Sequence, residues 1–340
     1  MRILHTADVH LRQHDDERWE ALRAVVALGA EEKVKALVIS GDLFDRGINA
    51  EDLKGYVRPL FSGTGMKVVI LPGNHDADSY AGGMYFGEDV AILDDVHSPV
   101  RLGDVSIFGI PFRPVGTEGV LETLHALADE MEADRTNILL FHGELLDTFF
   151  SRSDFGEEGP KRYMPARLAY FEELSVNYVL AGHFHSRFDV RRLGNGGYFV
   201  YPGSPVSVTR RETGQRKVNL FEVGGPPQPH ALDTSHFEEI AVRLDPFRDA
   251  GPLAMIRERL SEVHPRARIL LTVSGFVNSQ KMGMTETELA GRIRQLAGSR
   301  AVDPVLEFSD IGRVMEDELF KSFARRLDET VQDEARRVRM

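Results

Sequence analysis

Five short segments of the chain place histidine, aspartate or asparagine beside glycine or two residues apart. Each segment comes at or just after the end of a short apolar run, where a buried strand is expected to end. In open α/β sheets, ligands bind at the carboxyl ends of the strands, so the five segments are expected to meet in one place. The segments are Asp8-Val9-His10, Gly41-Asp42-Leu43-Phe44-Asp45-Arg46, Gly73-Asn74-His75-Asp76, His142-Gly143 and Gly182-His183-Phe184-His185.

The spacing within these segments suits a shared site. Asp8 and His10 are two residues apart, as are His183 and His185, which puts both side chains of a pair on one side of an extended backbone. Each segment alone is ordinary turn chemistry, but five of the twelve histidines fall within the five segments. Protein stability gives no reason for histidine and aspartate at five separate strand ends. The pattern therefore indicates a functional cluster.

The side chains of this cluster offer only nitrogen and oxygen atoms to a ligand. The chain has no cysteine, which excludes disulfides, iron–sulfur clusters and thiolate zinc sites. A nitrogen and oxygen set of this size suits a pair of divalent ions such as Mn²⁺, which a carboxylate can bridge. Two ions about 3.5–4 Å apart can polarise a phosphoryl oxygen, deprotonate a water and stabilise in-line displacement. The expected reaction is therefore phosphoester hydrolysis.

The composition limits how a phosphate-bearing substrate is attracted. The chain has 340 residues, of which 42% are hydrophobic and 28% charged, as in folded globular proteins. Its 41 Lys and Arg and 53 Asp and Glu give 41 − 53 = −12, so local arginines or metal ions must attract phosphate. Arg12 and Arg46 follow motif residues and are candidates for this binding. We find no apolar run long enough to span a bilayer and no signal peptide in residues 1–10, and expect a soluble cytoplasmic protein.

Alternating strand and helix patterns must position the cluster. Short runs rich in Val, Ile and Leu predict buried strands at residues 3–4, 36–40, 67–71, 105–110, 137–141 and 178–181. Apolar residues at helical spacing predict helices at 19–30 and 120–131. This alternation predicts an α/β architecture with partly parallel sheets. A Gly-rich turn at 194–197 and shorter spacing predict antiparallel strands that close a second sheet within 188–223.

A change of composition divides the chain. Residues 224–229, Gly-Gly-Pro-Pro-Gln-Pro, disfavour both helix and strand, and we expect a domain of residues 1–229 to end there. Residues 230–309 follow a β-α-β-α-β pattern and are expected to form a small α/β domain. Residues 310–340 are expected to form an amphipathic helix. Its apolar stripe comprises Val314, Met315, Leu319, Phe323, Leu327 and Val331.

The five segments, in this order, resemble the motifs of the calcineurin-like metallophosphoesterase superfamily. The resemblance covers residues 1–223 and implies a two-sheet α-β-β-α sandwich. It also implies two bound divalent ions, with Asp42 bridging them. His75 would act on the phosphate as general acid or transition-state stabiliser, and Asp45 would orient His75. One ion would be held by Asp8, His10 and His185, and the other by Asn74, His142 and His183.

Within the superfamily, further features resemble the SbcD-type DNA exonucleases, bacterial counterparts of the meiotic recombination eleven nuclease. Two of these features are short segments, His-Thr-Ala-Asp-Val-His at residues 5–10 and Tyr201-Pro202-Gly203-Ser204-Pro205. The third is the small α/β unit, which resembles that family's DNA-capping domain. The resemblance implies a DNA exonuclease and endonuclease acting on DNA ends or single-stranded regions, with Mn²⁺ preferred and Mg²⁺ or another divalent ion open. It also implies an SbcC-like coiled-coil ATPase partner in double-strand-break repair, a homodimer and no membrane.

Two other functions stay open. The same dimetal centre would serve a phosphomonoesterase, a phosphoprotein phosphatase or a cyclic-nucleotide phosphodiesterase, since residues 41–47 also fit the phosphatase pattern. A non-catalytic scaffold is a third interpretation, which the complete set of expected ligands disfavours. The capping unit and residues 202–205 favour the nuclease, whereas the acidic net charge weakly favours a small substrate. The apolar stripe within 310–340 is expected to contact the chain itself, a second copy or the ATPase.

Overall fold

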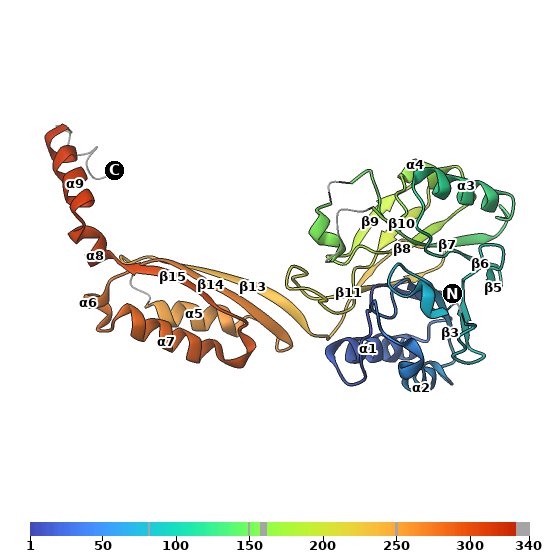
Figure 1. Cartoon of the computed structure of the whole chain (residues 1–340), viewed down its shortest axis with the longest axis horizontal. Helices are drawn as coiled ribbons and strands as arrows, with labels where there is room; N and C mark the ends of the chain where they lie inside the picture. Colours follow the sequence, from blue (N-terminus) through green and yellow to red (C-terminus); the bar gives the residue numbers. More distant parts are fainter. Residues whose placement is uncertain (81, 149, 157–161, 249–250, 331–340) are drawn as a thin grey trace. The chain divides into compact units, whose positions relative to one another are not determined.

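The structure of the chain is a computed structural model that describes all residues except 81, 149, 157–161, 249–250 and 331–340 (Figure 1). Contacts between residues divide it into two compact units, Met1–Phe237 and Glu238–Met340. Each unit has a sheet or sheets and a hydrophobic core of its own. Every residue of the candidate cluster belongs to the first unit.

The described residues of the first unit form two sheets, and the first sheet begins with the chain. Its strand order is β12-β11-β1-β2-β3-β4, in which β1 to β4 run parallel and β11 runs antiparallel to β1. Its strands are β1 (Arg2–Thr6), β2 (Ala36–Ser40), β3 (Lys67–Leu71), β4 (Val90–Ile92), β11 (Lys217–Glu222) and β12 (Pro229–Ala231).

The second sheet has the strand order β5-β6-β7-β8-β10-β9, and its four central strands run parallel. Its strands are β5 (Val100–Leu102), β6 (Val105–Ile110), β7 (Thr136–His142), β8 (Tyr178–Gly182), β9 (Asp189–Arg192) and β10 (Tyr198–Tyr201). Antiparallel strands were expected to close this sheet within residues 188–223. Only β9 does so, because β10 runs parallel to β8 and β11 crosses to the first sheet.

The two sheets pack face to face, and helices cover their outer faces (Figure 1). Side chains alternate between the two faces of a strand, so Leu4 packs toward the helices while Ile3 packs between the sheets. The helices are α1 (Glu17–Glu31) and α2 (Ala50–Phe61) on the first sheet and α3 (Thr117–Ala128) and α4 (Leu168–Glu172) on the second, with short 3₁₀ turns η1 (Ala77–Tyr80) and η2 (Arg152–Phe155). This arrangement is the α-β-β-α sandwich that the motif resemblance implies.

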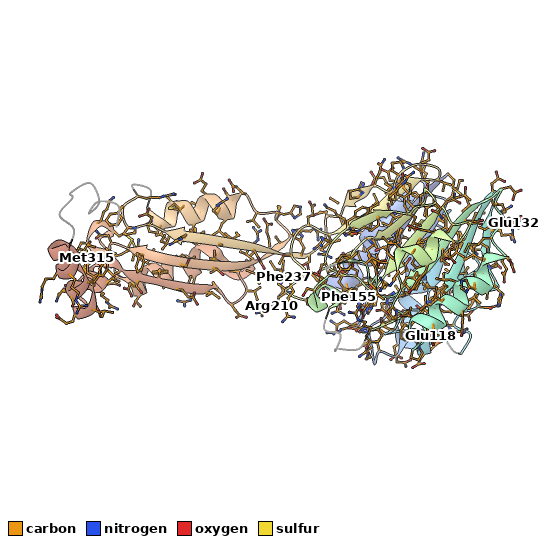
Figure 2. All side chains as sticks on the ribbon, turned by 90° about the horizontal axis from the view of Figure 1, so that it is seen from above. Glu118, Glu132, Phe155, Arg210, Phe237 and Met315 are labelled. Atoms are coloured by element: carbon orange, nitrogen blue, oxygen red, sulfur yellow. The ribbon has the colours of Figure 1, made fainter. Side chains whose placement is uncertain are left out.

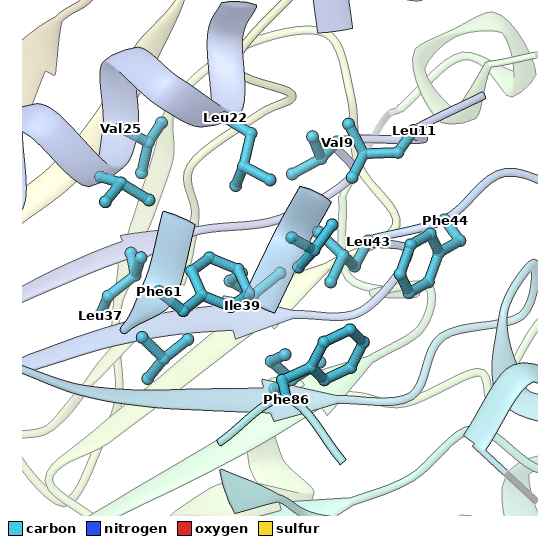
Figure 3. Packing of buried hydrophobic residues seen from close by; sticks show 14 of the residues in the cluster. Val9, Leu11, Leu22, Val25, Leu37, Ile39, Leu43, Phe44, Phe61 and Phe86 are labelled. Atoms are coloured by element: carbon cyan, nitrogen blue, oxygen red, sulfur yellow. The ribbon is translucent and has the colours of Figure 1, made fainter. Parts of the chain in front are cut away.

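The core between the first sheet and its helices fixes the strand ends that precede the candidate residues (Figure 3). Leu22 and Val25 of α1 belong to the same buried cluster as Leu37 and Ile39 of β2 and Phe61 of α2. Burial of each such side chain is worth about 1.5–3 kcal/mol. The strands are thereby held rigidly, while the loops at their carboxyl ends are left to position polar groups.

The second unit is a small sheet with helices on one face (Figure 1). Its strands are hydrogen-bonded in the order β13-β14-β15, and Ile256, Leu271 and Ile293 lie in its core. The element order β13-α5-β14-α7-β15 matches the expected β-α-β-α-β pattern. The elements are β13 (His236–Leu244), α5 (Pro252–Ser261), β14 (Ala267–Val277), α6 (Ser279–Met282), α7 (Glu286–Ala297), η3 (Gly298–Arg300) and β15 (Val305–Asp310).

Two expectations about organisation differ from the structure. The segment 224–229 lies within the first unit, because Pro229–Ala231 forms β12 at the edge of the first sheet. The helix expected over 310–340 is divided into α8 (Ile311–Glu316) and α9 (Glu318–Thr330), because Asp317 is extended and its side chain accepts the N–H of Leu319 at 2.8 Å. Residues 331–340, with Val331 of the expected stripe, lie outside the described residues. None of the helices in the described ranges has the length and apolar composition needed to cross a membrane.

Candidate metal centre

The candidate residues come from the carboxyl ends of parallel strands in both sheets. Residues 8–10, 42–45 and 74–75 follow β1, β2 and β3 of the first sheet. His142 ends β7 of the second sheet, and residues 183–185 follow β8. Because the sheets pack face to face with these ends together, the segments that are far apart in the sequence meet in one buried cluster.

One group of donor atoms joins the two sheets. His10 Nε2 lies 3.2 Å from His185 Nε2, and His185 Nε2 lies 3.6 Å from Asp8 Oδ1. All three side chains are buried. Asp8 also accepts the backbone N–H of His183 at 3.0 Å. Two imidazole nitrogens and a carboxylate that converge out of contact with water suit a cation, which all three can bind at once.

A second group lies beside the first. His142 Nε2 is 3.3 Å from Asp42 Oδ2 and 2.9 Å from Asn74 Oδ1, and His183 belongs to the same group of donors. His142 Nδ1 donates to the backbone oxygen of Ser40 at 2.8 Å. Both ring nitrogens therefore face oxygen acceptors. Burial lowers the pKa of His142, but the charge of Asp42 outweighs burial and raises the pKa to about 9. A metal ion at Nε2 fits this arrangement in place of that proton.

Asp42 lies between the two groups. Its Oδ2 is 3.3 Å from His142 Nε2 in one group and 3.8 Å from His10 Nε2 in the other. Its Oδ1 accepts the backbone N–H of His75 at 2.9 Å, whereas the buried Oδ2 accepts no hydrogen bond from any described residue. Burial acts to raise the pKa of Asp42, but His142 outweighs burial and holds the pKa well below its usual value. An ionised, unsatisfied oxygen at this position suits a bridging ligand.

Glycines allow the donors to approach one another. A Cβ atom on Gly41 would lie 2.0 Å from His142 Nδ1, and one on Gly73 would lie 2.1 Å from Asp42 Oδ1. The glycines therefore leave room for the side chains of His142 and Asp42. The backbones of Asp8, His10, Asp42 and His183 also adopt φ values of 56°, 53°, 54° and 85°. Such conformations are costly for these residues and persist where function requires them.

His75 and Asp45 form a pair at the edge of the cluster. His75 Nδ1 lies 3.0 Å from Asp45 Oδ1, and the His75 ring meets the His10 ring edge-on at 4.7 Å. Asp45 Oδ2 accepts from Arg12 Nε at 2.5 Å and from Arg18 at 2.7 Å. His10, Asp45 and His75 also have donor atoms close enough to hold an ion. However, both oxygens of Asp45 already accept hydrogen bonds, which favours an orienting role for this carboxylate.

The two arginines expected to bind substrate differ in their relation to the cluster. Arg12 reaches Asp45 with its guanidinium while 60% of its side chain stays exposed. Arg46 is exposed, and its backbone N–H donates to Asp45 Oδ1 at 2.8 Å. Both arginines therefore contact Asp45 at the rim of the cluster, Arg12 with its side chain and Arg46 with its backbone N–H.

Several buried charged groups around the cluster were not expected from the sequence. Glu144 Oε1 lies 4.0 Å from His183 Nε2, and Glu212 Oε1 lies 3.3 Å from His185 Nδ1. Arg18 donates to Asp45 and to the backbone oxygen of His10. Arg216 is 3% exposed and donates to the backbone oxygens of Ser204 and Ser186. Glu144 directly follows the His142-Gly143 motif, which is a local signal; the other groups have none.

Comparison with known proteins gives the class of this site. Residues 1–187, more than half of the chain, match the calcineurin-like phosphoesterases. The chain belongs to this family, whose members use two divalent metal ions. The described residues supply buried groups of His and Asp that can hold such ions.

Among curated proteins, the chain is similar to the DNA double-strand break repair protein Mre11 of Methanosarcina mazei and to that of Methanosarcina acetivorans. Each of the two proteins is 24% identical to this chain, and each match covers 81% of the length of this chain. The matches cover 45% and 46% of those proteins, so the chain spans about half the length of the curated relatives it matches.

Two solved structures are also similar at low identity. The crystal structure of the protein TT1561 of Thermus thermophilus matches with a TM-score of 0.45 and 15% identity, over 64% of this chain and 93% of that chain. A dimetal phosphatase from Danio rerio matches with a TM-score of 0.44 and 11% identity, over 65% of this chain and 91% of that chain.

Proposed function

We propose that the chain is a DNA nuclease that hydrolyses phosphodiester bonds with two divalent ions, of which Mn²⁺ is preferred. The observation that carries this proposal is the pair of buried donor groups on either side of Asp42. Its assignment to DNA draws on the similarity to proteins named for DNA double-strand break repair. The small α/β unit that follows the metallophosphoesterase domain supports the same assignment as a DNA-capping domain.

The proposed ligands divide between the two groups. Asp42, whose Oδ2 accepts no hydrogen bond from the described residues, would be shared by the two ions. When bound, the ions would supply charge stabilisation to a phosphoester undergoing in-line displacement. One ion would be held by Asp8, His10 and His185, and the other by Asn74, His142 and His183.

His75 is proposed as the catalytic residue that is not a ligand. Asp45 accepts from Nδ1 of His75, which fixes the tautomer and leaves Nε2 to stabilise or protonate the leaving oxygen. Arg12 and Arg18 hold the Asp45 carboxylate in place. Burial acts to raise the pKa of Asp45, but hydrogen bonds from His10 and His75 outweigh burial and hold the pKa well below its usual value. Asp45 therefore stays ionised and orients His75.

The substrate is proposed to be a DNA end or a single-stranded region. The chain has a net charge of −12, so attraction of DNA must be local. Arg12 and Arg46 are the proposed phosphate-binding residues at the rim, and Arg12 keeps most of its side chain exposed. We also propose that the protein acts in the cytoplasm, since a chain with no cysteine needs no oxidising compartment to fold.

An SbcC-like coiled-coil ATPase is the proposed partner, and the active form is proposed to be a homodimer. Helices α8 and α9 support an external contact, because Leu319 is 82% exposed and Phe323 is 56% exposed. A groove of about 830 Å³ lies along these helices and is lined by both residues and by Val314 and Phe320. A helical partner can bury such a surface by placing apolar residues at i and i+4 into the groove.

The function is tested with end-labelled double-stranded DNA and with p-nitrophenyl phosphate, each in Mn²⁺ and in Mg²⁺. We expect release of nucleotides from DNA, faster in Mn²⁺, and little hydrolysis of the ester. The variant Asp42→Ala, purified in parallel, controls for contaminating nucleases. Hydrolysis of the ester with intact DNA would instead assign the centre to a phosphatase, and inactivity on both, with ions bound, would assign it to a scaffold.

A further inference from the structure

The loop of residues 204–216 connects the two sheets beside the candidate metal centre. It leads the chain from β10 of the second sheet to β11 of the first. Although it is a loop, it buries two charged side chains, Glu212 at 0% and Arg216 at 3% exposure. Buried charges in a loop are expensive unless each is paired and hydrogen-bonded. Their partners therefore indicate what the loop does.

The Glu212 carboxylate is fixed by its own loop. Its Oε2 accepts the backbone N–H of Val208 at 2.7 Å and the hydroxyl of Ser204 at 3.0 Å. Its Oε1 accepts the backbone N–H of Thr209 at 3.2 Å and the hydroxyl of the same residue at 3.1 Å. These donors satisfy the carboxylate and hold it in one position. Oε1 also lies 3.3 Å from His185 Nδ1, which is the contact that leaves the loop.

His185 is held from two sides. Its ring faces Glu212 with Nδ1, while Nε2 faces Asp8 Oδ1 at 3.6 Å and His10 Nε2 at 3.2 Å. Its backbone oxygen accepts a hydrogen bond from Arg216 of the same loop. A carboxylate beside Nδ1 accepts a hydrogen bond from the ring N–H, so the lone pair of the ring lies on Nε2 and points at the Asp8 and His10 side chains.

We propose that Glu212 is a positioning residue for the metal centre, which orients His185 and keeps its Nε2 available to bind an ion. The inference rests on the proposed assignment of His185 as a ligand and deepens that assignment. A histidine ligand with a carboxylate on its other nitrogen has a fixed tautomer and a more basic donor atom.

Hydrogen bonds that do not involve Glu212 also hold the loop of residues 204–216 in place. The positioning of His185 by Glu212 can therefore be tested separately from the stability of the loop. Gly214 donates its N–H to the backbone oxygen of Phe237 at 2.7 Å, and Phe237, which is labelled in Figure 2, donates its N–H to Ser207 Oγ at 3.2 Å. Arg216 donates to the backbone oxygens of Ser204 and Ser186 at 2.9 and 3.0 Å. These bonds hold the loop without the Glu212 side chain, so its removal is expected to affect His185 more than the fold.

The test is a calorimetric titration of the metal-free full chain with Mn²⁺ alone. The wild-type chain is expected to bind two ions. Glu212→Ala is expected to bind one ion on the order of 100-fold more weakly and the other normally, and Glu212→Gln to weaken the same ion on the order of 10-fold, since an outer carboxylate typically contributes 10- to 100-fold. If the Ala variant does not fold, the Gln variant, which keeps the side-chain volume, decides the question.

Asn137→Ala is the matched control for loss of a buried polar group. Asn137 lies near the start of β7, at the opposite end from His142, and its amide donates to the backbone oxygens of Glu132 and Ser175. This variant is expected to lower the unfolding temperature of the metal-free chain while both ions bind normally. Wild-type affinity for both ions in a folded Glu212 variant, or a loss no larger than in Asn137→Ala, would overturn the inference. A wild-type chain that binds fewer than two ions would instead overturn the metal centre itself.

Discussion

At the scale of single residues, the two ring nitrogens of His142 indicate that the site suits a cation. A neutral imidazole has one N–H, yet both ring nitrogens of His142 face oxygen acceptors. Nδ1 lies 2.8 Å from the Ser40 oxygen, and Nε2 lies 2.9 Å from Asn74 Oδ1. A second proton or a metal ion on Nε2 would satisfy both nitrogens. The neighbouring Asp42 favours either positive charge, so the site suits a cation.

Replacement of Asp42 by alanine removes an oxygen that lies 3.3 Å from His142 Nε2 in one group and 3.8 Å from His10 Nε2 in the other. We expect Asp42→Ala to lose at least one bound ion and all hydrolysis. Metal analysis of the purified variant and a phosphodiester assay measure this. Asp104→Ala, at an exposed aspartate in the turn between β5 and β6, is the control and should retain both ions. Two equivalents of metal and full activity in Asp42→Ala would refute the bridging assignment.

Replacement of His75 separates catalysis from metal binding. Because His75 is proposed to act on the leaving oxygen and not on an ion, His75→Ala should keep the metal content and lower the rate about 10²–10⁴-fold. Asp45→Asn should give a smaller loss, since the amide still contacts His75 Nδ1 but carries no charge. Metal analysis and steady-state rates on the same phosphodiester measure both effects. Loss of metal from His75→Ala would make His75 a ligand and contradict the proposed division of roles.

At the scale of elements, the ends of β2 and β8 approach each other so closely that only glycine fits at position 182, directly before His183. Gly182 ends β8, and a Cβ atom there would lie 2.0 Å from the backbone oxygen of Ser40 at the end of β2. The backbone of a neighbouring strand cannot move as a side chain can. A side chain at position 182 would therefore push apart the two sheets where both groups of donors meet.

We predict that Gly182→Ala destabilises the chain by about 1–3 kcal/mol, as overpacking of a core does, and weakens metal binding. Gly55→Ala is the matched control. Gly55 lies in α2, a Cβ atom there meets nothing within 4 Å, and alanine is the better helix former by about 1 kcal/mol. This control should be slightly more stable and bind metal normally. Chemical denaturation and Mn²⁺ titration of both variants measure the difference, and equal behaviour of the two would disprove the steric argument.

At the scale of the whole molecule, the two units have separate cores, and the candidate metal centre belongs to the first alone. The second unit ends in helices whose apolar residues are exposed, among them Met315, Leu319 and Phe323. These side chains are not part of the core described for that unit. A surface contact with another chain is the role that we propose for this apolar helix face.

The double variant Leu319→Glu and Phe323→Glu tests this contact. Since both side chains are exposed, the variant should change the free energy of unfolding by no more than about 0.5 kcal/mol, as surface substitutions do. It should keep its metals and lose association, with itself or with a coiled-coil ATPase, in sedimentation. Lys321→Glu with Arg325→Glu, at exposed residues on other sides of α9, is the control. A loss of several kcal/mol would show a buried stripe, and unchanged assembly would rule out an interface here.

The sequence alone determined the chemistry and most of the elements. Residue type and local spacing were enough to predict the donors at five strand ends, because strands have a period of two and end at glycine or aspartate. The same local patterns predicted the β-α-β-α-β order of the second unit. Proposed roles that depend on the family motif, such as the bridging by Asp42, also needed only the order of the segments.

Only the tertiary structure decided which donors lie together and what holds them. The backbone of His183 donates to Asp8 across 175 residues, and Glu212 lies against His185 across 27 residues. No local periodicity encodes such pairs, because they depend on how two sheets pack and on where a loop returns. The same reason explains why β11 joined the first sheet and why Arg216, in a basic run of sequence, is buried. Local patterns fix what a residue can do, whereas long-range packing fixes what it touches.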